Sequence, residues 1–301
     1  MARSTTRNWR FAVGILAIFA TVQFVRSSEI PAIPPAELVR LTVQNEIRAT
    51  ENPGARHMFA ARKETLRGSQ TKLYCETRDA MAGMAIANDD KPLTPQQRQA
   101  EEARLEQLMN NPAELARKRQ REKEDAERIG RIVRAMPDAF FFEYDGTMPG
   151  QSGLGKDGGE LIRLKFRPNP KYDPPSHVEQ VLQGMQGFLL IDASTHRIAR
   201  IDGTLFREVG FGWGILGHLD KGGHFLVEQT DVGDGSWDMS RMSLAFTGKI
   251  MLFKKIDIKS TEVYSDFRPV PSSTTFAQGV DLLKKQEATL AENQRLETNH
   301  K

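Results

Sequence analysis

The feature that most constrains this fold is a series of segments, between residues 139 and 270, in which apolar and polar residues alternate. In Leu161–Phe166, three apolar side chains, Ile162, Leu164 and Phe166, fall on one side of an extended chain. Similar segments follow at 188–191, 197–206, 225–232, 237–246 and 249–258, with a bend expected at Gly248. One dry face and one wet face are typical of an antiparallel sheet that packs on a core.

The first third of the chain predicts one helix and two further strands. Apolar residues at helical spacing predict a helix over 36–49. Extended segments at 57–66 and 72–86 flank Gly68-Ser69, which favours a hairpin turn between them. The last segment, from Phe276 onward, predicts a polar helix.

Residues 94–136 predict two helices rich in mixed charge. Thr94, Pro95 and Gln97 form a helix start with a capping box, and Asn111-Pro112 begins a second helix that Pro137 ends. Opposite charges three and four residues apart support a solvated helix face, and a binding arm is the alternative interpretation. A modest apolar stripe is available for docking: Leu115, Ile129, Ile132, Val133 and Met136.

Together these patterns predict an α+β fold that is mainly antiparallel β. We expect a curved half-barrel sheet with packed helices and a charged helical insertion. The expected organisation is a signal peptide at 1–27, a helix and first strands at 28–92, the insertion at 93–136, the sheet at 137–270 and a C-terminal helix or tail at 271–301. Residues 28–92 and 137–270 are expected to form one domain.

The N-terminus has the layout of a secretory signal. Three arginines, Arg3, Arg7 and Arg10, precede an apolar run over 11–25, and small residues Ser27 and Ser28 follow. The run is short for a membrane span, so we expect a periplasmic or otherwise exported protein. An uncleaved N-terminal anchor and an apolar helix of a soluble protein are the alternatives.

Charge and cysteine content exclude two classes of protein. Removing residues 1–27 takes away four arginines and lowers the formal net charge from +3 to about −1, so a general hold on nucleic-acid phosphates is not expected. The single cysteine, Cys75, excludes an intramolecular disulfide. It lies in an extended-looking segment, 72–76, and a buried small side chain is favoured over a reactive thiol.

No phosphate-binding or metal-binding motif in the sequence is complete. Gly150–Lys156 begins like a phosphate-binding loop, but Asp157 stands where Ser or Thr is required and a strand follows where a helix should begin. Asp231, Asp234 and Asp238 lack the spacing of a calcium loop. The six histidines are scattered without metal-ligand spacing. No catalytic residue, metal or cofactor is therefore predicted.

One glycine-interleaved apolar segment, Phe211–Gly217, is a candidate wall of a hydrophobic cavity. Glycine lets the backbone bend or approach closely. The alternative is that these are core residues at a curved strand. The predicted ligand-lining residues are Phe211, Trp213, Ile215, Leu216 and Phe225.

Four segments resemble a known family. These are Gly187–Asp192, Arg200–Gly203, Phe211–Gly217 and Val263–Arg268, in a chain that opens with a helix after its export signal. This layout resembles the outer-membrane lipoprotein-sorting (LolA-like) superfamily over roughly residues 36–270, apart from the helices at 94–136. The resemblance implies a half-open antiparallel barrel whose concave side holds acyl chains or a partner segment.

Three functions follow from these observations. The first is an exported binding protein that holds a lipid, or the acyl chains of a lipoprotein, by hydrophobic burial without chemistry. The second is an envelope protein-interaction or stress-sensing module that meets a protein partner through the helices at 94–136. The third is a hydrolase, which requires a polar cluster that the linear sequence does not show.

Overall fold

The computed structural model describes residues 33–299 except 53, 212–216, 234 and 251–253. The signal segment expected at 1–27 therefore lies outside the described residues. The helices are α1 (Pro35–Glu51), α2 (Pro95–Asn110), α3 (Pro112–Ala139) and α4 (Phe276–Asn299), with a 3-10 turn, η1, at Glu179–Gly184. None of the helices within the described ranges has the length and apolar content required to span a bilayer.

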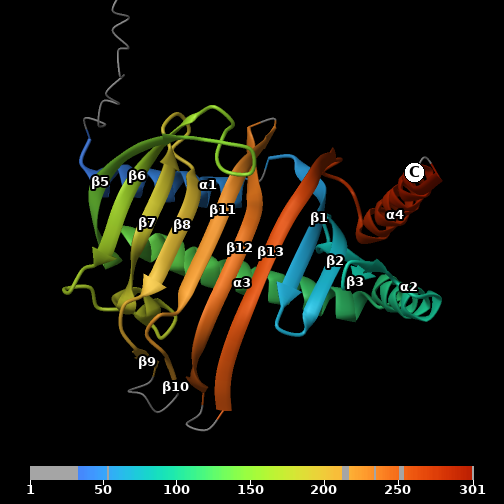
Figure 1. Ribbon diagram of the computed structural model, residues 1–301, viewed down its shortest axis with the longest axis horizontal. Coiled ribbons are helices and arrows are strands. Elements are labelled where there is room, and N and C mark those ends of the chain that lie inside the picture. Colours follow the sequence, from blue (N-terminus) through green and yellow to red (C-terminus); the bar gives the residue numbers. More distant parts are fainter. Residues whose placement is uncertain (1–32, 53, 212–216, 234, 251–253, 300–301) are drawn as a thin grey trace, which may run out of the picture.

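The strands form one large open antiparallel sheet, as the alternation predicts (Figure 1). Its order is β4-β3-β2-β1-β13-β12-β11-β8-β7-β6-β5, with the short β9 and β10 beside β12. The N-terminal strands are β1 (Arg56–Thr65), β2 (Gly68–Cys75), β3 (Ala82–Asn88) and β4 (Lys91–Pro92). The central ones are β5 (Phe140–Pro149), β6 (Glu160–Pro168), β7 (Met185–Asp192), β8 (Ile198–Leu205), β9 (Val209–Phe211) and β10 (Gly217–Leu219). The last are β11 (His224–Gly233), β12 (Ser236–Ile250) and β13 (Lys254–Val270).

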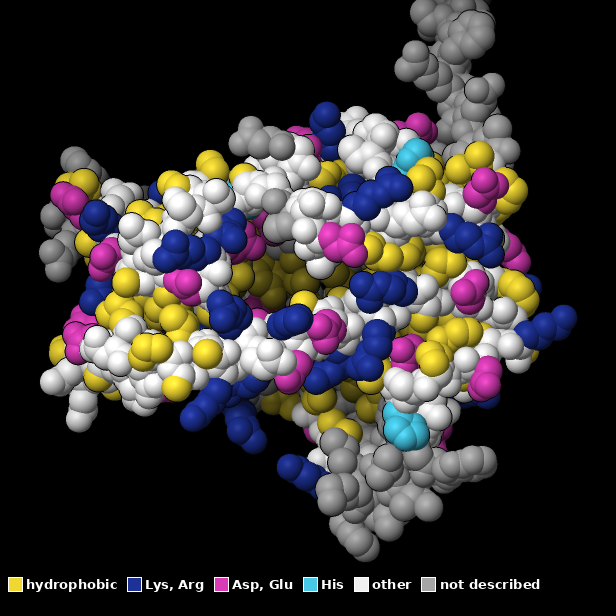
Figure 2. All heavy atoms as spheres, turned by 180° about the vertical axis from the view of Figure 1, so that it is seen from behind, with side chains coloured by type: hydrophobic (Ala, Val, Ile, Leu, Met, Phe, Trp, Pro, Cys, Tyr) yellow, Lys and Arg dark blue, Asp and Glu magenta, His cyan; other side chains and the backbone are white. Residues whose placement is uncertain are grey.

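The larger core lies between one face of β5–β8 and the helices α1 and α3. We call this side of the sheet the inner face; it carries Ile162, Leu164 and Leu189, which are all buried. The period-two pattern of β6 places these apolar residues inward, as expected from the sequence. From behind, the inner face is hollowed, and apolar side chains lie at the bottom of the hollow (Figure 2).

Helix α3 crosses behind the sheet instead of standing out as an arm (Figure 1). Its 28 residues span about 42 Å at 1.5 Å per residue. Met136 is buried in the larger core, and Ile132 and Val133 pack against it. Ile129, which the apolar stripe placed among the docking residues, is 63% exposed, so the docked face is narrower than expected.

The outer face is covered at two places. Helix α4 packs on β2 and β3, where Phe276, Val280 and Leu283 form a second core with Leu73 and Cys75. Cys75 is fully buried there, as expected for a structural cysteine. The loop at 150–159 covers the sheet farther along and buries Leu154, so its glycines serve a connection between strands.

The expected helix end at Pro137 was wrong, because α3 continues through Pro137 to Ala139; a proline this close to the end of a helix removes one backbone donor without ending it. Two strand expectations were also wrong. The extended segment at 72–86 is interrupted at 76–81 and forms two strands, β2 and β3. Gly248 is no bend, because β12 runs through it and pairs it with both Ile256 and Leu219. A Cβ at Gly248 would lie 2.1 Å from the carbonyl oxygen of His218, so glycine is required for the close approach of β10.

One edge of the sheet is protected by α2. The Glu101 carboxylate accepts a hydrogen bond from the Ala85 N–H at 2.7 Å, and Arg104 donates to the Gly83 carbonyl at 2.7 Å. These contacts satisfy backbone groups of β3 that β4, with only two residues, leaves unpaired.

Candidate functional site

A pocket of about 890 Å³ lies between the inner face of the N-terminal strands and α3. Its floor consists of three aromatic residues from adjacent strands: Phe59 in β1, Tyr74 in β2 and Tyr264 in β13. The Phe59 ring stacks on Tyr74, with centroids 5.4 Å apart and planes at 27°, and lies 6.0 Å from the ring of Tyr264. The floor is therefore a continuous aromatic surface.

Strand register places these rings together. Phe59 and Tyr74 are direct partners across the β1–β2 hairpin, and Tyr264 pairs with Ala61 beyond an irregularity in β1. Because side chains alternate along β2, Tyr74 faces the pocket while its neighbours Leu73 and Cys75 face α4. One strand thus contributes to the pocket on one side and to the second core on the other.

The turn at 76–81, which the sequence did not reveal, forms one wall. The Thr77 hydroxyl donates to the Ala80 carbonyl at 2.6 Å and accepts from the Ala80 N–H at 3.2 Å, which closes the turn. The Asp79 carboxylate accepts the Phe276 N–H at the start of α4, at 2.9 Å. Helix α3 forms the opposite wall and is joined to the turn where Glu122 accepts the Met81 N–H at 3.1 Å.

The aromatic floor is electrically neutral at physiological pH. Burial raises the pKa of Tyr74 and, together with the nearby charge of Glu262, raises the pKa of Tyr264. Both phenols therefore keep their protons. Apolar rings with neutral hydroxyl tips suit a largely hydrophobic ligand.

A partly buried polar cluster lies beside the floor. The His57 ring contacts Phe267 edge-on, with centroids 6.3 Å apart, and its Nδ1 lies 3.0 Å from the Asp238 carboxylate. The Glu76 carboxylate accepts the His57 backbone N–H at 2.8 Å. Of these groups only Glu76 lines the pocket, and the His57 side chain is 4% exposed. These contacts therefore link β1, the end of β2 and β12. They do not place an acid–base pair where a substrate could reach it.

Burial raises the pKa of both carboxyl groups in this cluster. For Glu76, burial outweighs the hydrogen bond from the His57 N–H, and the charge of Asp238 raises the pKa further. For Asp238, burial outweighs the attraction of His57 and Arg197. A raised pKa in the folded state favours the protonated acid.

Replacing Glu76 by glutamine is expected to make stability less dependent on pH. Because the Glu76 pKa is higher in the folded protein than in the unfolded chain, its stabilising contribution is complete below the unfolded-chain pKa. That contribution is lost as pH rises through the folded pKa. Glutamine keeps an oxygen to accept the His57 N–H and does not ionise, so the variant should gain on the wild type between pH 4 and 8. Urea unfolding across this range measures the difference, and parallel curves would refute it.

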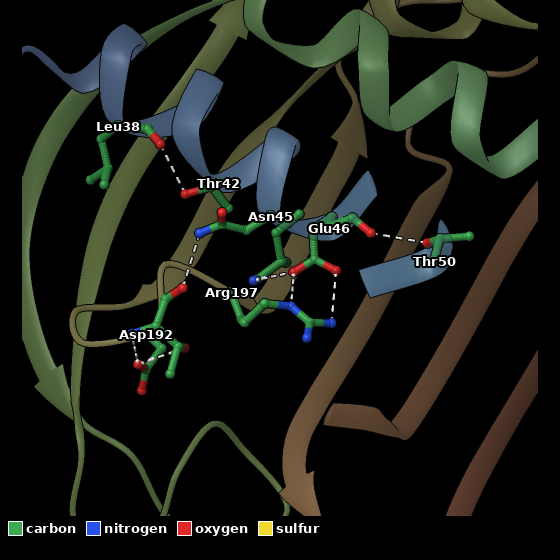
Figure 3. A network of polar contacts seen from close by, with 9 residues as sticks. Leu38, Thr42, Asn45, Glu46, Thr50, Asp192 and Arg197 are labelled. Atoms are coloured by element: carbon green, nitrogen blue, oxygen red, sulfur yellow. Dashed lines mark hydrogen bonds and ion pairs between the residues drawn. The ribbon is translucent and has the colours of Figure 1, made fainter. Parts of the chain in front are cut away.

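A polar network on α1 fixes that helix over the β7–β8 connection (Figure 3). The Glu46 carboxylate accepts hydrogen bonds from Arg197 Nε at 2.9 Å and from the Ile198 N–H at 2.8 Å, while Asn45 donates to the Thr195 carbonyl at 3.1 Å. Burial works to raise the pKa of Asp192, but hydrogen bonds from Ser194 and Thr195 outweigh it and hold the pKa below its usual value. The connection is thereby rigid beneath α1.

The predicted ligand-lining residues do not fall at this pocket as far as they are described. Phe225 is half-buried against the larger core, on β11, three strands from β1. Gly203 gives its ring room, because a Cβ there would lie 2.3 Å from it. Trp213, Ile215 and Leu216, and the side chain of Phe211, lie outside the described residues. A ligand role for these five residues stays a prediction.

The structure also brings together Glu208, His218 and Asp220 near β9 and β10, with ligand atoms within 4.8 Å of one another. These residues are 2 to 12 positions apart in a hairpin whose pairing could not be read from the sequence. His218 Nε2 lies 3.3 Å from Asp220, which also accepts a hydrogen bond from Thr247 at 2.7 Å. These contacts within the protein explain why His218 and Asp220 lie close together, and we assign no metal to the cluster.

Comparisons with known proteins give a likeness in structure alone. No family model matches the chain, and no curated protein matches its sequence. One similar solved structure is described as an outer membrane lipoprotein-sorting protein domain from Vibrio parahaemolyticus, with 10% identity and a TM-score of 0.29 over 82% of this chain and 99% of that one. Another is a DUF1329 family protein from Desulfovibrio piger, with 8% identity and a TM-score of 0.27 over 83% of this chain and 100% of that one. The first carries the family name that the sequence motifs suggested; at these scores neither likeness carries an inference about ligand or activity.

Proposed function

We propose that the protein binds a hydrophobic ligand, a lipid or the acyl chain of a lipoprotein, in the pocket between the inner face and α3. The observation that carries this proposal is the open pocket with an aromatic floor of Phe59, Tyr74 and Tyr264. Its volume, about 890 Å³, lies within the range of about 300–1,000 Å³ that is typical of small-molecule sites. Binding would come from burial of apolar surface, at about 25 cal/mol per Å², and would make or break no bond.

We further propose that binding takes place outside the cytoplasm. The support is the run of arginines and apolar residues over 1–27, which has the layout of an export signal. On this account residues 28–92 and 137–270 act as one binding domain, and α3, within the helices at 93–136, supplies its pocket wall. A protein partner bound on those helices is the competing function.

Two substitutions in the pocket are expected to weaken binding of a neutral apolar probe, 1-N-phenylnaphthylamine, by about tenfold or more each. Phe59→Ala removes the central ring of the floor, and burial of such a ring is worth about 1.5–3 kcal/mol. Met81→Trp fills the pocket with a larger side chain and keeps the backbone N–H that Glu122 accepts. Fluorescence titration measures both dissociation constants.

The matched control is Phe188→Ala, which removes a half-buried ring that lies under Arg163 outside this pocket. It should leave probe binding unchanged. Circular dichroism should show that all three variants remain folded. Equal affinity in wild type, F59A and M81W would refute the proposed pocket, and would leave the helices at 93–136 as the better candidate for the functional surface.

A further inference from the structure

The mouth of the same pocket has an uneven distribution of available charge. Five acidic and five basic side chains line it, so the formal charges balance. The acidic and basic side chains differ in how many of them already form ion pairs or hydrogen bonds within the protein. Figure 2 shows Lys and Arg side chains, together with Asp and Glu side chains, at the border of the apolar hollow.

The acidic side chains are engaged. Glu76 and Asp79 accept backbone N–H groups, from His57 at 2.8 Å and from Phe276 at 2.9 Å. The other three form ion pairs: Glu122 with Lys118 at 2.6 Å, Asp125 with Arg128 at 3.2 Å and Glu262 with Lys63 at 3.4 Å. Asp79 also lies 3.6 Å from Arg78, so four of the five lining carboxylates are in ion pairs within the described residues.

Two of the cations form no ion pair in the described part of the chain. Arg56, from β1, donates to the carbonyl oxygen of Ser272, which carries no charge. Arg119, from α3, is exposed and makes no hydrogen bond or ion pair with any residue in the described part of the chain. The two guanidinium groups belong to opposite sides of the pocket, one on the sheet and one on the helix. A guanidinium is a fork of N–H donors that suits carboxylate and phosphate oxygens.

We propose that the ligand is an anionic amphiphile, whose acyl chain lies on the aromatic floor and whose carboxylate or phosphate head meets Arg56 and Arg119 at the mouth. This inference rests on the proposed function and adds the chemistry of the head group. The chain supplies the apolar burial, and the head supplies charge-assisted hydrogen bonds that a neutral head of similar size cannot make.

Three probes test the head group at constant chain length: dodecanoate, dodecanol and dodecyltrimethylammonium, measured by calorimetry as dissolved monomers. Inorganic phosphate, which has no chain, tests for a site that binds a free anion. Dodecanoate is expected to bind about tenfold more tightly than dodecanol, as one or two charge-assisted hydrogen bonds at a partly exposed site would give. The preference should shrink as salt rises from 20 to 300 mM, because rim charges are screened. Inorganic phosphate alone should not bind detectably.

Arg119→Gln and Arg56→Gln should each reduce the preference for dodecanoate and leave dodecanol binding unchanged. Arg121→Gln, on the same helix but outside the pocket lining, is the control and should keep the full preference. Arg119 is exposed, so R119Q decides the question even if R56Q disturbs its contact with Ser272. Equal binding of dodecanoate and dodecanol, or tighter binding of the trimethylammonium probe, would overturn the anionic head and leave the hydrophobic pocket standing. Binding of phosphate alone would show an anion site that does not need an acyl chain, and would overturn the amphiphile. Binding of none of the alkyl probes would overturn the pocket as well.

Discussion

Replacing Leu189 by alanine is expected to lower the free energy of unfolding by about 3–5 kcal/mol. Leu189 has 0% exposure and lies in β7 at the centre of the larger core, where neighbouring strands and α1 leave little freedom to fill the space. The loss combines the transfer free energy of the deleted atoms with the cavity that remains. Urea unfolding followed by circular dichroism measures it.

Leu66→Ala is the matched control. Leu66 lies just after β1 and is 63% exposed, so the same chemical change should alter stability by less than about 0.5 kcal/mol. Similar losses in the two variants would show that Leu189 does not lie in a tightly packed core.

Replacing Glu46 by alanine is expected to cost about 3 kcal/mol or more, because it breaks a largely buried ion pair and leaves its partner uncompensated. The side chains of Glu46 and Arg197 are 12% and 15% exposed, and the same carboxylate also accepts the Ile198 N–H. Removing it therefore strands one charge and one backbone donor beneath α1. Thermal and urea unfolding both report the change.

Two further variants make this prediction specific. Gln44→Ala, at an exposed position of the same helix, should change little. The double variant E46L/R197M should recover part of the loss, because two apolar side chains remove the stranded charge. If E46A is as stable as the wild type, the network in Figure 3 does not anchor α1.

Local patterns in the sequence predicted the sheet and the starts of α2 and α3, but the end of α3 expected at Pro137 was wrong. The alternation at 161–166 gave the inward face of β6, and Thr94-Pro95 and Asn111-Pro112 gave the starts of α2 and α3. These signals depend only on neighbours in the chain. The break at 76–81 was missed because it contains neither glycine nor proline, and the Thr77 hydroxyl closes it instead.

The pocket could not be predicted from the sequence because its floor joins strands that are far apart in the chain. The hairpin turn before Gly68 pairs Phe59 with Tyr74, so that contact could have been found by counting the register outward from the turn. Tyr264 lies beside them because β13, the last strand in chain order, pairs with β1, the first. That pairing has no local signal in the sequence.

Photo-cross-linking with a diazirine-bearing fatty acid tests the central claim most directly, because the site of labelling does not depend on any substitution. After irradiation and proteolysis, mass spectrometry should find the adducts on peptides from β1, β2, β13 and the first half of α3, with competition by unlabelled fatty acid. Adducts confined to strands β5–β8, or spread over the surface without competition, would contradict a ligand held between the sheet and α3.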